Sequence, residues 1–260
     1  MRSVVLCLSS ALALTSCALF KNSDEHHTDY YTVGPNGEST KTKPQLPDRI
    51  SERTLVLTEL RSVSLSSEVR DRLFPPRDAE SSEGAMPTEA TLQRSTRAQE
   101  LTERIDAKAR DSMNGELSHV GDLHIANLPT PDVVYRIEAV ATVNGINMLD
   151  ESGSSWAFWE SDGGSSNSKV TSMEIETEVT LHCHLADGSA QVSSGKCKVV
   201  RKVELSKEQQ RQISAEKGQA SEADSATQQL SQRHILGAVA SAMHGAAVDL
   251  ITPWATPDEN

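Results

Sequence analysis

The sequence is poor in aromatic residues and in positive charge. Its 260 residues include only three Trp, three Tyr and three Phe, and 25 Lys and Arg against 37 Asp and Glu give a net charge of −12. With 37% hydrophobic residues, much of the chain cannot contribute to a buried core, which predicts one modest domain with unstructured attachments. A basic stripe with interleaved aromatics is absent, so we expect no nucleic-acid partner.

Recognisable catalytic motifs are also missing. The sequence contains no nucleophile elbow, no glycine-rich phosphate loop and no pair of histidines at helical spacing. In the run from His182 to His184, alternation along a predicted strand turns Cys183 away from both histidines, so the three residues cannot share a metal ion. We therefore expect a protein that is not an enzyme and that has no cofactor and no metal site.

The N-terminal apolar run is too short and too interrupted by serines and a threonine to span a membrane. It begins with Arg2, continues with a short apolar segment and ends with small residues before Cys17. This pattern is typical of a secretory signal that ends in a lipobox, so residues 1–16 are predicted to be removed and Cys17 to be acylated, as with palmitate. Cys7 is a poor alternative acceptor because the large Leu6 precedes it.

Acyl chains on Cys17 would hold the protein in a membrane, since each buried methylene contributes about 0.8 kcal/mol. Ala18, rather than Asp, follows this cysteine, which resembles the sorting signal for the outer membrane. The expected location is therefore the cell outer membrane, with the rest of the chain facing the periplasm.

Residues 17–52 are poor in large aliphatic side chains and contain several turn-forming Gly and Pro residues, which predicts a disordered tether. Fully extended, such a tether would reach roughly 110 Å at about 3.3–3.6 Å per residue. We expect a single ordered domain at 53–251. A short tail at 252–260 follows, because Thr252-Pro253 is predicted to end the last helix.

Hydrophobic periodicity divides the domain into strands and helices. Continuous or alternating apolar patterns predict strands at 53–60, within 117–125, and at 133–143, 173–185 and 196–205. Apolar residues at helical spacing predict helices at 87–112 and 223–251. The predicted fold class is α+β, with a mixed or mostly antiparallel sheet of about five strands, one long helix after the first strand and an Ala-rich C-terminal helix packed on the sheet.

The clearest pattern is a hairpin that turns at Asp187-Gly188. A strict two-residue turn would place the inward Thr177 opposite the outward Lys198. Residues that stand opposite each other on neighbouring strands point to the same face of the sheet, so this pairing is inconsistent with the alternation. One extra residue, in a bulge around 193–195, would place Thr177 opposite Val199 and restore the alternation. We therefore predict that bulge.

The same hairpin carries Cys183 and Cys197, and an exported protein with two such cysteines raises the question of a disulfide. In the bulged register Cys197 faces Val179, roughly 13 Å along the strand from Cys183, which is too far for a bridge. A longer loop that pairs the two cysteines directly would permit one. The disulfide therefore remains an alternative.

An insertion at 144–170 contains Gly, Ser, Asp and Glu around Trp156, Phe158 and Trp159. On an exposed loop these rings would be an anchor for a protein partner, since Trp and Phe bury large areas and concentrate binding energy. Folded back, they would instead cover an otherwise aromatic-poor core. Both interpretations remain open.

Small residues recur every fourth position in the last predicted helix, at Gly237, Ser241 and Gly245. They allow a neighbour to approach closely, and in water that neighbour is more often the domain's own sheet than a second protomer. A homo-oligomer remains an alternative.

The order of elements resembles the periplasmic α+β domain shared by the curli-secretion channel lipoprotein and by outer-membrane lipoprotein activators of penicillin-binding proteins. The residues that carry the resemblance are Pro131 to Glu138 for one strand, Leu185 to Val192 for the hairpin and Ala238 to Ile251 for the last helix. It covers roughly residues 53 to 251.

The resemblance implies two functions. One is a tethered, non-catalytic interaction module that docks on an envelope protein of cell-wall synthesis or transport. The other is a subunit of an oligomeric outer-membrane secretion pore, whose membrane-crossing hairpins need strands of about 9–11 residues with alternating apolar positions. Residues 144–170 do not show this alternation, so the interaction module is the expected function.

Overall fold

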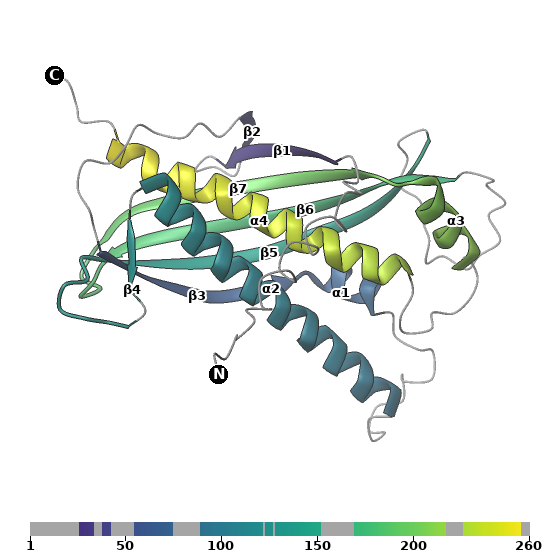
Figure 1. Ribbon diagram of the computed structural model, residues 1–260, viewed down its shortest axis with the longest axis horizontal. Helices are drawn as coiled ribbons and strands as arrows, with labels where there is room; N and C mark the ends of the chain where they lie inside the picture. The colour runs from purple at the N-terminus through teal and green to yellow at the C-terminus, as the bar shows by residue number, and fades with distance from the viewer. Residues whose placement is uncertain are drawn as a thin grey trace, which may run out of the picture.

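The computed structural model describes residues 26–33, 38–42, 55–74, 89–121, 123–126, 128–151, 169–216 and 226–255. Within them lie seven strands and four helices (Figure 1). The strands are β1 (His26–Val33), β2 (Ser39–Thr42), β3 (Leu55–Leu65), β4 (His124–Ala126), β5 (Tyr135–Asp150), β6 (Val170–Leu185) and β7 (Gln191–Glu204). The helices are α1 (Ser67–Leu73), α2 (Glu89–Gly121), α3 (Lys207–Glu216) and α4 (Ala226–Ala255).

The strands form one mixed sheet in the order β2-β1-β7-β6-β5-β3-β4. β3 is parallel to β4 and β5, and the other neighbouring pairs are antiparallel. Helices α2 and α4 lie next to each other across one face of the sheet (Figure 1). The α+β class and the C-terminal helix packed on the sheet are confirmed, and the sheet has more strands than the predicted five.

The core lies between that face and the two helices. Along α2, every fourth residue from Leu101 to Leu117 is at most 1% exposed, so a single apolar stripe faces the sheet. Helix α4 has a stretch, Gln228–Trp254, that is long and apolar enough to cross a membrane by length and composition. Because 61% of its most apolar window is buried inside the domain, we interpret α4 as a core helix.

The β6–β7 hairpin has the predicted register. Thr177 pairs with Val199, and the pairing shifts between Ser193 and Gln191, which leaves Val192 as the extra residue. The bulge is therefore present, immediately before the predicted 193–195. It turns the lysines and glutamates of both strands to the face away from the helices.

The predicted tether at 17–52 is wrong for two of its segments. His26–Val33 forms β1, which pairs along β7 from His26 opposite Val203 to Thr32 opposite Cys197. Ser39–Thr42 forms β2 at the edge of the sheet. Backbone groups of β7 supply the hydrogen bonds for β1, and any residue except proline can make such bonds, so the polar composition of this segment does not prevent pairing.

Other boundaries also differ from the predictions. The range 117–125, predicted to contain a short strand, begins inside α2, because Leu117 continues the buried stripe of that helix. The short strand is His124–Ala126, at the end of the range. β5 runs on to Asp150 and β6 starts at Val170, so part of the predicted insertion belongs to the sheet. The predicted tail is helical as far as Ala255, because Trp254 packs on Tyr135 with ring centroids 5.4 Å apart.

Candidate functional site

Several segments start or stop at one end of the sheet, which we call the α3 end. β1 begins there, with His26 opposite Val203. β5 stops and β6 starts there, with Asp150 opposite Val170, and β7 ends at Glu204 just before α3. Figure 1 shows α3 beside the ends of β5, β6 and β7. The chain leading back to Cys17 and the segment joining β5 to β6 therefore both leave the sheet at the α3 end.

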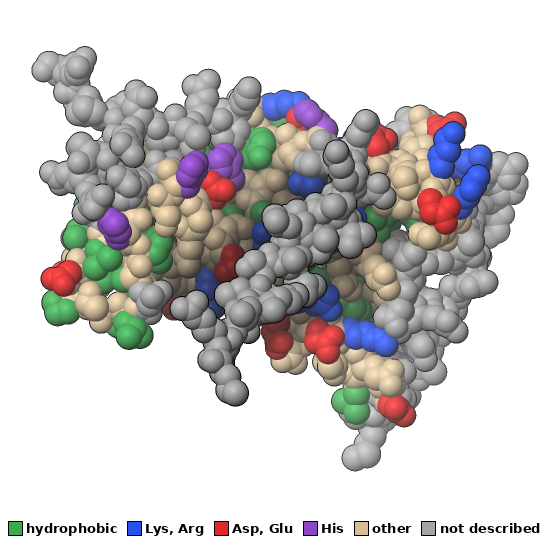
Figure 2. All heavy atoms as spheres, viewed as in Figure 1, with side chains coloured by type: hydrophobic (Ala, Val, Ile, Leu, Met, Phe, Trp, Pro, Cys, Tyr) green, Lys and Arg blue, Asp and Glu red, His purple; other side chains and the backbone are tan. Residues whose placement is uncertain are grey.

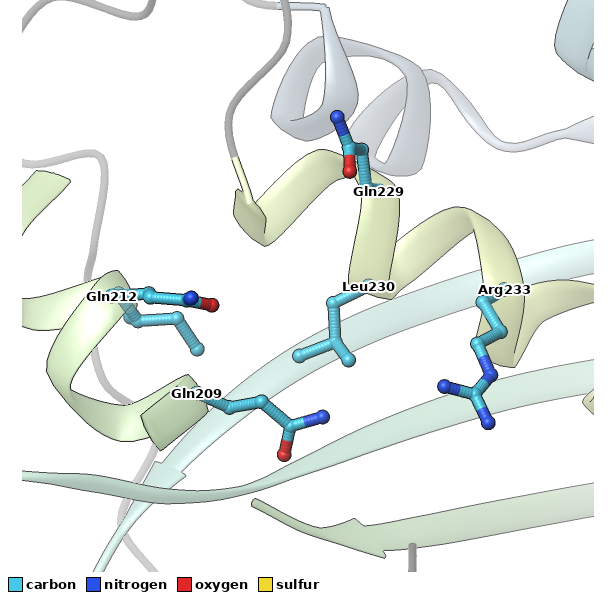
Figure 3. Close-up of a pocket in the computed structure, with 6 residues that line it drawn as sticks. Gln209, Gln212, Gln229, Leu230 and Arg233 are labelled. Carbon is cyan, nitrogen blue, oxygen red and sulfur yellow. The ribbon is translucent and has the colours of Figure 1, made fainter. Parts of the chain in front are cut away.

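A pocket of about 330 Å³ opens between α3 and the first turns of α4 at this end (Figure 3). Gln209 extends from α3 beneath α4, and Arg233 extends from α4 toward the strands. Ile213 forms an apolar part of the wall and is 1% exposed. The residues lining the pocket are Gln209, Gln212, Ile213, Gln229, Leu230 and Arg233.

Arg201 lies on β7 close to this pocket. In the ladder it stands opposite Ile175 of β6, on the face covered by helices. Its guanidinium packs against α4 at Gly237, where an added Cβ would lie 3.0 Å from the Arg201 Cζ. Burial lowers the pKa of Arg201, and the positive charge of Arg233 also lowers it, against an opposing effect of Tyr30. Arg201 is thus a cation that the fold partly removes from water.

The opposite face of the sheet carries charges that are paired. Glu138 is only 7% exposed, and its carboxylate accepts a hydrogen bond from Arg61 at 2.6 Å. A second arginine on this face, Arg136, pairs with Glu59. Cross-strand pairs with N···O distances of 2.9 Å join β7 to β6, between Lys196 and Glu178 and between Lys198 and Glu176. Because acids and bases compensate each other here, we assign this network to the stability and register of the sheet.

Cys183 and Cys197 are free thiols, so the disulfide alternative is wrong. The register explains this result, since Cys183 pairs with Ser193 and Cys197 pairs with Val179. Both thiols are buried, and burial raises the pKa of Cys183 to about 11 and that of Cys197 to about 12. They are core residues with little thiolate at neutral pH.

Among the residues that the structure describes, no group of three or more His, Cys, Asp or Glu side chains is arranged to hold a metal ion. His182 and His184 lie on the face opposite Cys183, with ring centroids 6.3 Å apart. His184 lies 3.9 Å from the carboxylate of Glu138, at the margin of the paired network.

The other predicted site residues lie outside the described residues. These are the lipid-attachment candidate Cys17 and the contact candidates Trp156, Phe158 and Trp159. What the structure adds is the position of the strand ends that flank them, since β1, β5 and β6 all end or begin at the α3 end.

Sequence reasoning missed Arg201, although a signal was present. The inward positions of β7 are Cys197, Val199, Arg201 and Val203, so one charged residue interrupts an otherwise apolar series. A charged side chain at a strand position that faces the core must either pair with an opposite charge or reach solvent. Arg233 gave no comparable signal, because polar residues are common in the first turns of a helix.

No protein-family model matches the sequence, and no curated protein matches it. Among solved structures, a neuraminyllactose-binding hemagglutinin homolog from Helicobacter pylori is 9% identical, with a TM-score of 0.33, and the match covers 77% of this chain and 82% of that one.

A second similar structure is the PelC dodecamer from Paraburkholderia phytofirmans, which is 8% identical with a TM-score of 0.28 and covers 90% of this chain and 100% of that one. A single-residue variant of PelC gives a TM-score of 0.27 at 9% identity, covering 87% and 99% of the two chains.

Proposed function

We propose that the protein is a bacterial lipoprotein, acylated at Cys17 and anchored in the outer membrane, whose periplasmic domain acts as a non-catalytic interaction module close to that membrane. The observation that carries the proposal is the short distance in sequence between the lipobox cysteine and the first strand. Only residues 18–25 separate Cys17 from His26. At about 3.3–3.6 Å per residue, the anchor lies within roughly 30 Å of the start of β1.

This reach is far less than the roughly 110 Å expected for a tether that extends to residue 52. The partner of such a module would therefore lie in or on the outer membrane, where the domain can meet it without crossing the periplasm. Because β1 begins at the α3 end, this is the end of the sheet to which the segment carrying Cys17 is joined.

We further propose that Trp156, Phe158 and Trp159 make the partner contact. Their segment leaves the sheet at Asp150 and returns at Val170, both at the α3 end. The anchor and the aromatic residues would thus serve the same membrane-proximal region, and large aromatic side chains supply much of the binding energy at protein interfaces.

The pore alternative has less support. Membrane-crossing hairpins need alternate side chains that face lipid. Where β5 extends into the predicted insertion, its apolar side chains are committed to the domain, because Ile146 and Met148 are each 5% exposed and Leu149 is 8% exposed.

Crosslinking in intact envelopes tests the proposed function. The native chain should incorporate labelled palmitate and capture a membrane protein, whereas Cys17→Ala should lose both. The double variant Trp156→Ala/Trp159→Ala should keep the label and lose the partner at a nearly unchanged thermal midpoint, because it removes contact area and not core.

The matched control is Leu92→Ala, which truncates a side chain on α2 that is 57% exposed and should capture as well as the native chain. Normal capture by the double tryptophan variant together with a large fall in its thermal midpoint would contradict the contact and favour the aromatic flap. Labelling of Cys17→Ala at the native level would contradict the anchor.

A further inference from the structure

Exposed apolar side chains gather at the end of the sheet opposite α3, which we call the turn end (Figure 1). The turn end consists of residues 128–135, which lead into β5, and residues 185–192, which join β6 to β7. Leu128 is 70% exposed, Val134 46% and Val192 45%. Single exposed apolar side chains are normal, but three at one end of a domain indicate an interaction surface.

Hydrogen bonds hold the two segments of the turn end together. The Val134 N–H donates to the Leu55 carbonyl, and the Val134 carbonyl accepts from the Ala186 N–H, both at 3.0 Å. Val192 is the bulged residue on the next strand along the sheet. Figure 2 shows hydrophobic side chains gathered over this end, around β4 and the start of β5. The exposed apolar side chains therefore belong to neighbouring parts of one surface.

The backbone that presents Leu128 is restricted before any partner binds. Pro129 and Pro131 follow Leu128 closely, and each proline ring fixes its own φ angle. The Val133 N–H donates to the Thr130 carbonyl at 3.1 Å, which closes a turn. A surface whose backbone is already ordered loses little conformational entropy on binding.

The carboxylates of the turn end have no basic neighbours within it. It includes Asp132 and Asp187 and no Lys or Arg. Hydrogen bonds from Ser189 lower the pKa of Asp187, so this carboxylate is ionised at neutral pH. Arg136, the first arginine along β5, is already paired with Glu59. Such a surface repels an anionic lipid bilayer and attracts a protein that carries positive charge.

We propose that the turn end binds an envelope protein whose surface presents apolar side chains flanked by Lys or Arg. This contact is separate from the one proposed for Trp156, Phe158 and Trp159, whose segment leaves the sheet at the α3 end. β6 runs from one end to the other with 16 residues, which is about 50 Å. The location of the partner in the envelope rests on the proposed function, whereas its surface chemistry does not.

Photo-crosslinking in intact cells tests this surface. A photoreactive amino acid is placed at Val192 of the full chain, and mass spectrometry identifies the product and the crosslinked peptide. We expect one adduct with a different protein, at a surface where apolar side chains lie beside Lys or Arg. An adduct with a phospholipid, an adduct with a second, differently tagged copy, or no adduct would overturn the proposal.

Two sets of variants test which side chains make the contact. Leu128→Ser/Val134→Ser should reduce the adduct about fivefold or more, because two apolar contacts are lost. Asp132→Asn/Asp187→Asn should reduce it severalfold at low ionic strength, because the attraction to basic side chains is lost. Asparagine at 187 keeps an oxygen that accepts from the Ser189 N–H. All four replaced side chains are exposed, so the thermal midpoints should remain native.

Leu92→Ser is the matched control. It removes an apolar side chain of comparable exposure, 57%, from α2, and should leave the adduct at the native level. An equal loss in Leu92→Ser, or a native yield in either double variant of the turn end, would overturn the proposed contact. Trp156→Ala/Trp159→Ala should keep the adduct, so this surface and the proposed aromatic contact can fail separately.

Discussion

Two glycines determine how closely helix α4 approaches strand β7. A Cβ added at Gly195 would lie 2.2 Å from the Ala246 carbonyl oxygen and 2.5 Å from the Leu250 backbone nitrogen. A Cβ added at Gly245 would lie 2.3 Å from the Cys197 sulfur. The helix therefore touches the strand through its backbone, which confirms that the small residues of α4 serve the domain's own sheet.

At the residue scale, we predict that Gly195→Ala strongly destabilises the protein. The contact is with backbone atoms that cannot rotate away, so the helix must shift, at a cost of about 3 kcal/mol. Chemical denaturation monitored by circular dichroism measures this loss. The matched control is Gly115→Ala, since nothing lies within 4 Å of the added Cβ on the exposed side of α2. That variant should gain roughly 0.5–1 kcal/mol, and similar stabilities for the two variants would contradict the close packing.

At the element scale, β1 and β2 protect the edge of β7. Seven residue pairs join β1 to β7. Tyr30 of β1 also reaches α4, where its ring lies 6.5 Å from that of His244, measured between centroids. Without these strands, β7 would present an unpaired edge of the kind that promotes association of chains.

We therefore predict that deletion of residues 26–42 lowers stability by roughly 3 kcal/mol, given a few tenths to one kcal/mol for each cross-strand pair. The protein without residues 26–42 should also self-associate through the exposed edge of β7. Light scattering coupled to gel filtration detects this association. Deletion of 256–260 is the control, because those residues follow the last residue of α4. A monomer with native stability after deletion of 26–42 would restore the tether interpretation of this segment.

At the scale of the whole molecule, the fold and the proposed anchor together restrict the position of the domain. If Cys17 is acylated, the sheet begins at His26, no more than about 30 Å of chain from the anchor, and its opposite end carries the turn at Asp187-Gly188. The pocket between α3 and α4 and the last and first residues of β5 and β6 lie at the same end as His26. A short link thus selects which surface can meet a membrane-bound partner.

This geometry predicts the effect of a longer link. A Gly/Ser spacer of about 20 residues inserted before His26 adds an average span of about 25 Å. If the partner lies at the membrane, crosslinking to it should fall severalfold, because the effective concentration of the domain decreases. The same spacer inserted between Asp187 and Gly188, at the far end, should leave crosslinking unchanged. Increased capture with the spacer before His26 would indicate a partner farther from the membrane.

The sequence allowed prediction of the features that depend on near neighbours. Alternation and charge pairing were sufficient for the β6–β7 register, because Thr177 can face the core only if one residue bulges out. The helical spacing of apolar residues was sufficient to predict α2 and α4. The same spacing continues through Leu117, which would have extended the predicted α2 toward its observed end at Gly121. Nothing in the sequence indicated β1, because His26–Val33 lacks an apolar alternation.

The sequence by itself determined the α+β class, the central hairpin and the helix that packs on it, because hydrophobic burial depends on side chains whose order can be read directly. Only the tertiary structure decided that His26–Val33 joins the sheet, since its backbone hydrogen bonds carry no sequence signature. It also decided that Arg201 of β7 lies close enough to Arg233 of α4 for their charges to interact, because residues far apart in the chain come together only through the fold.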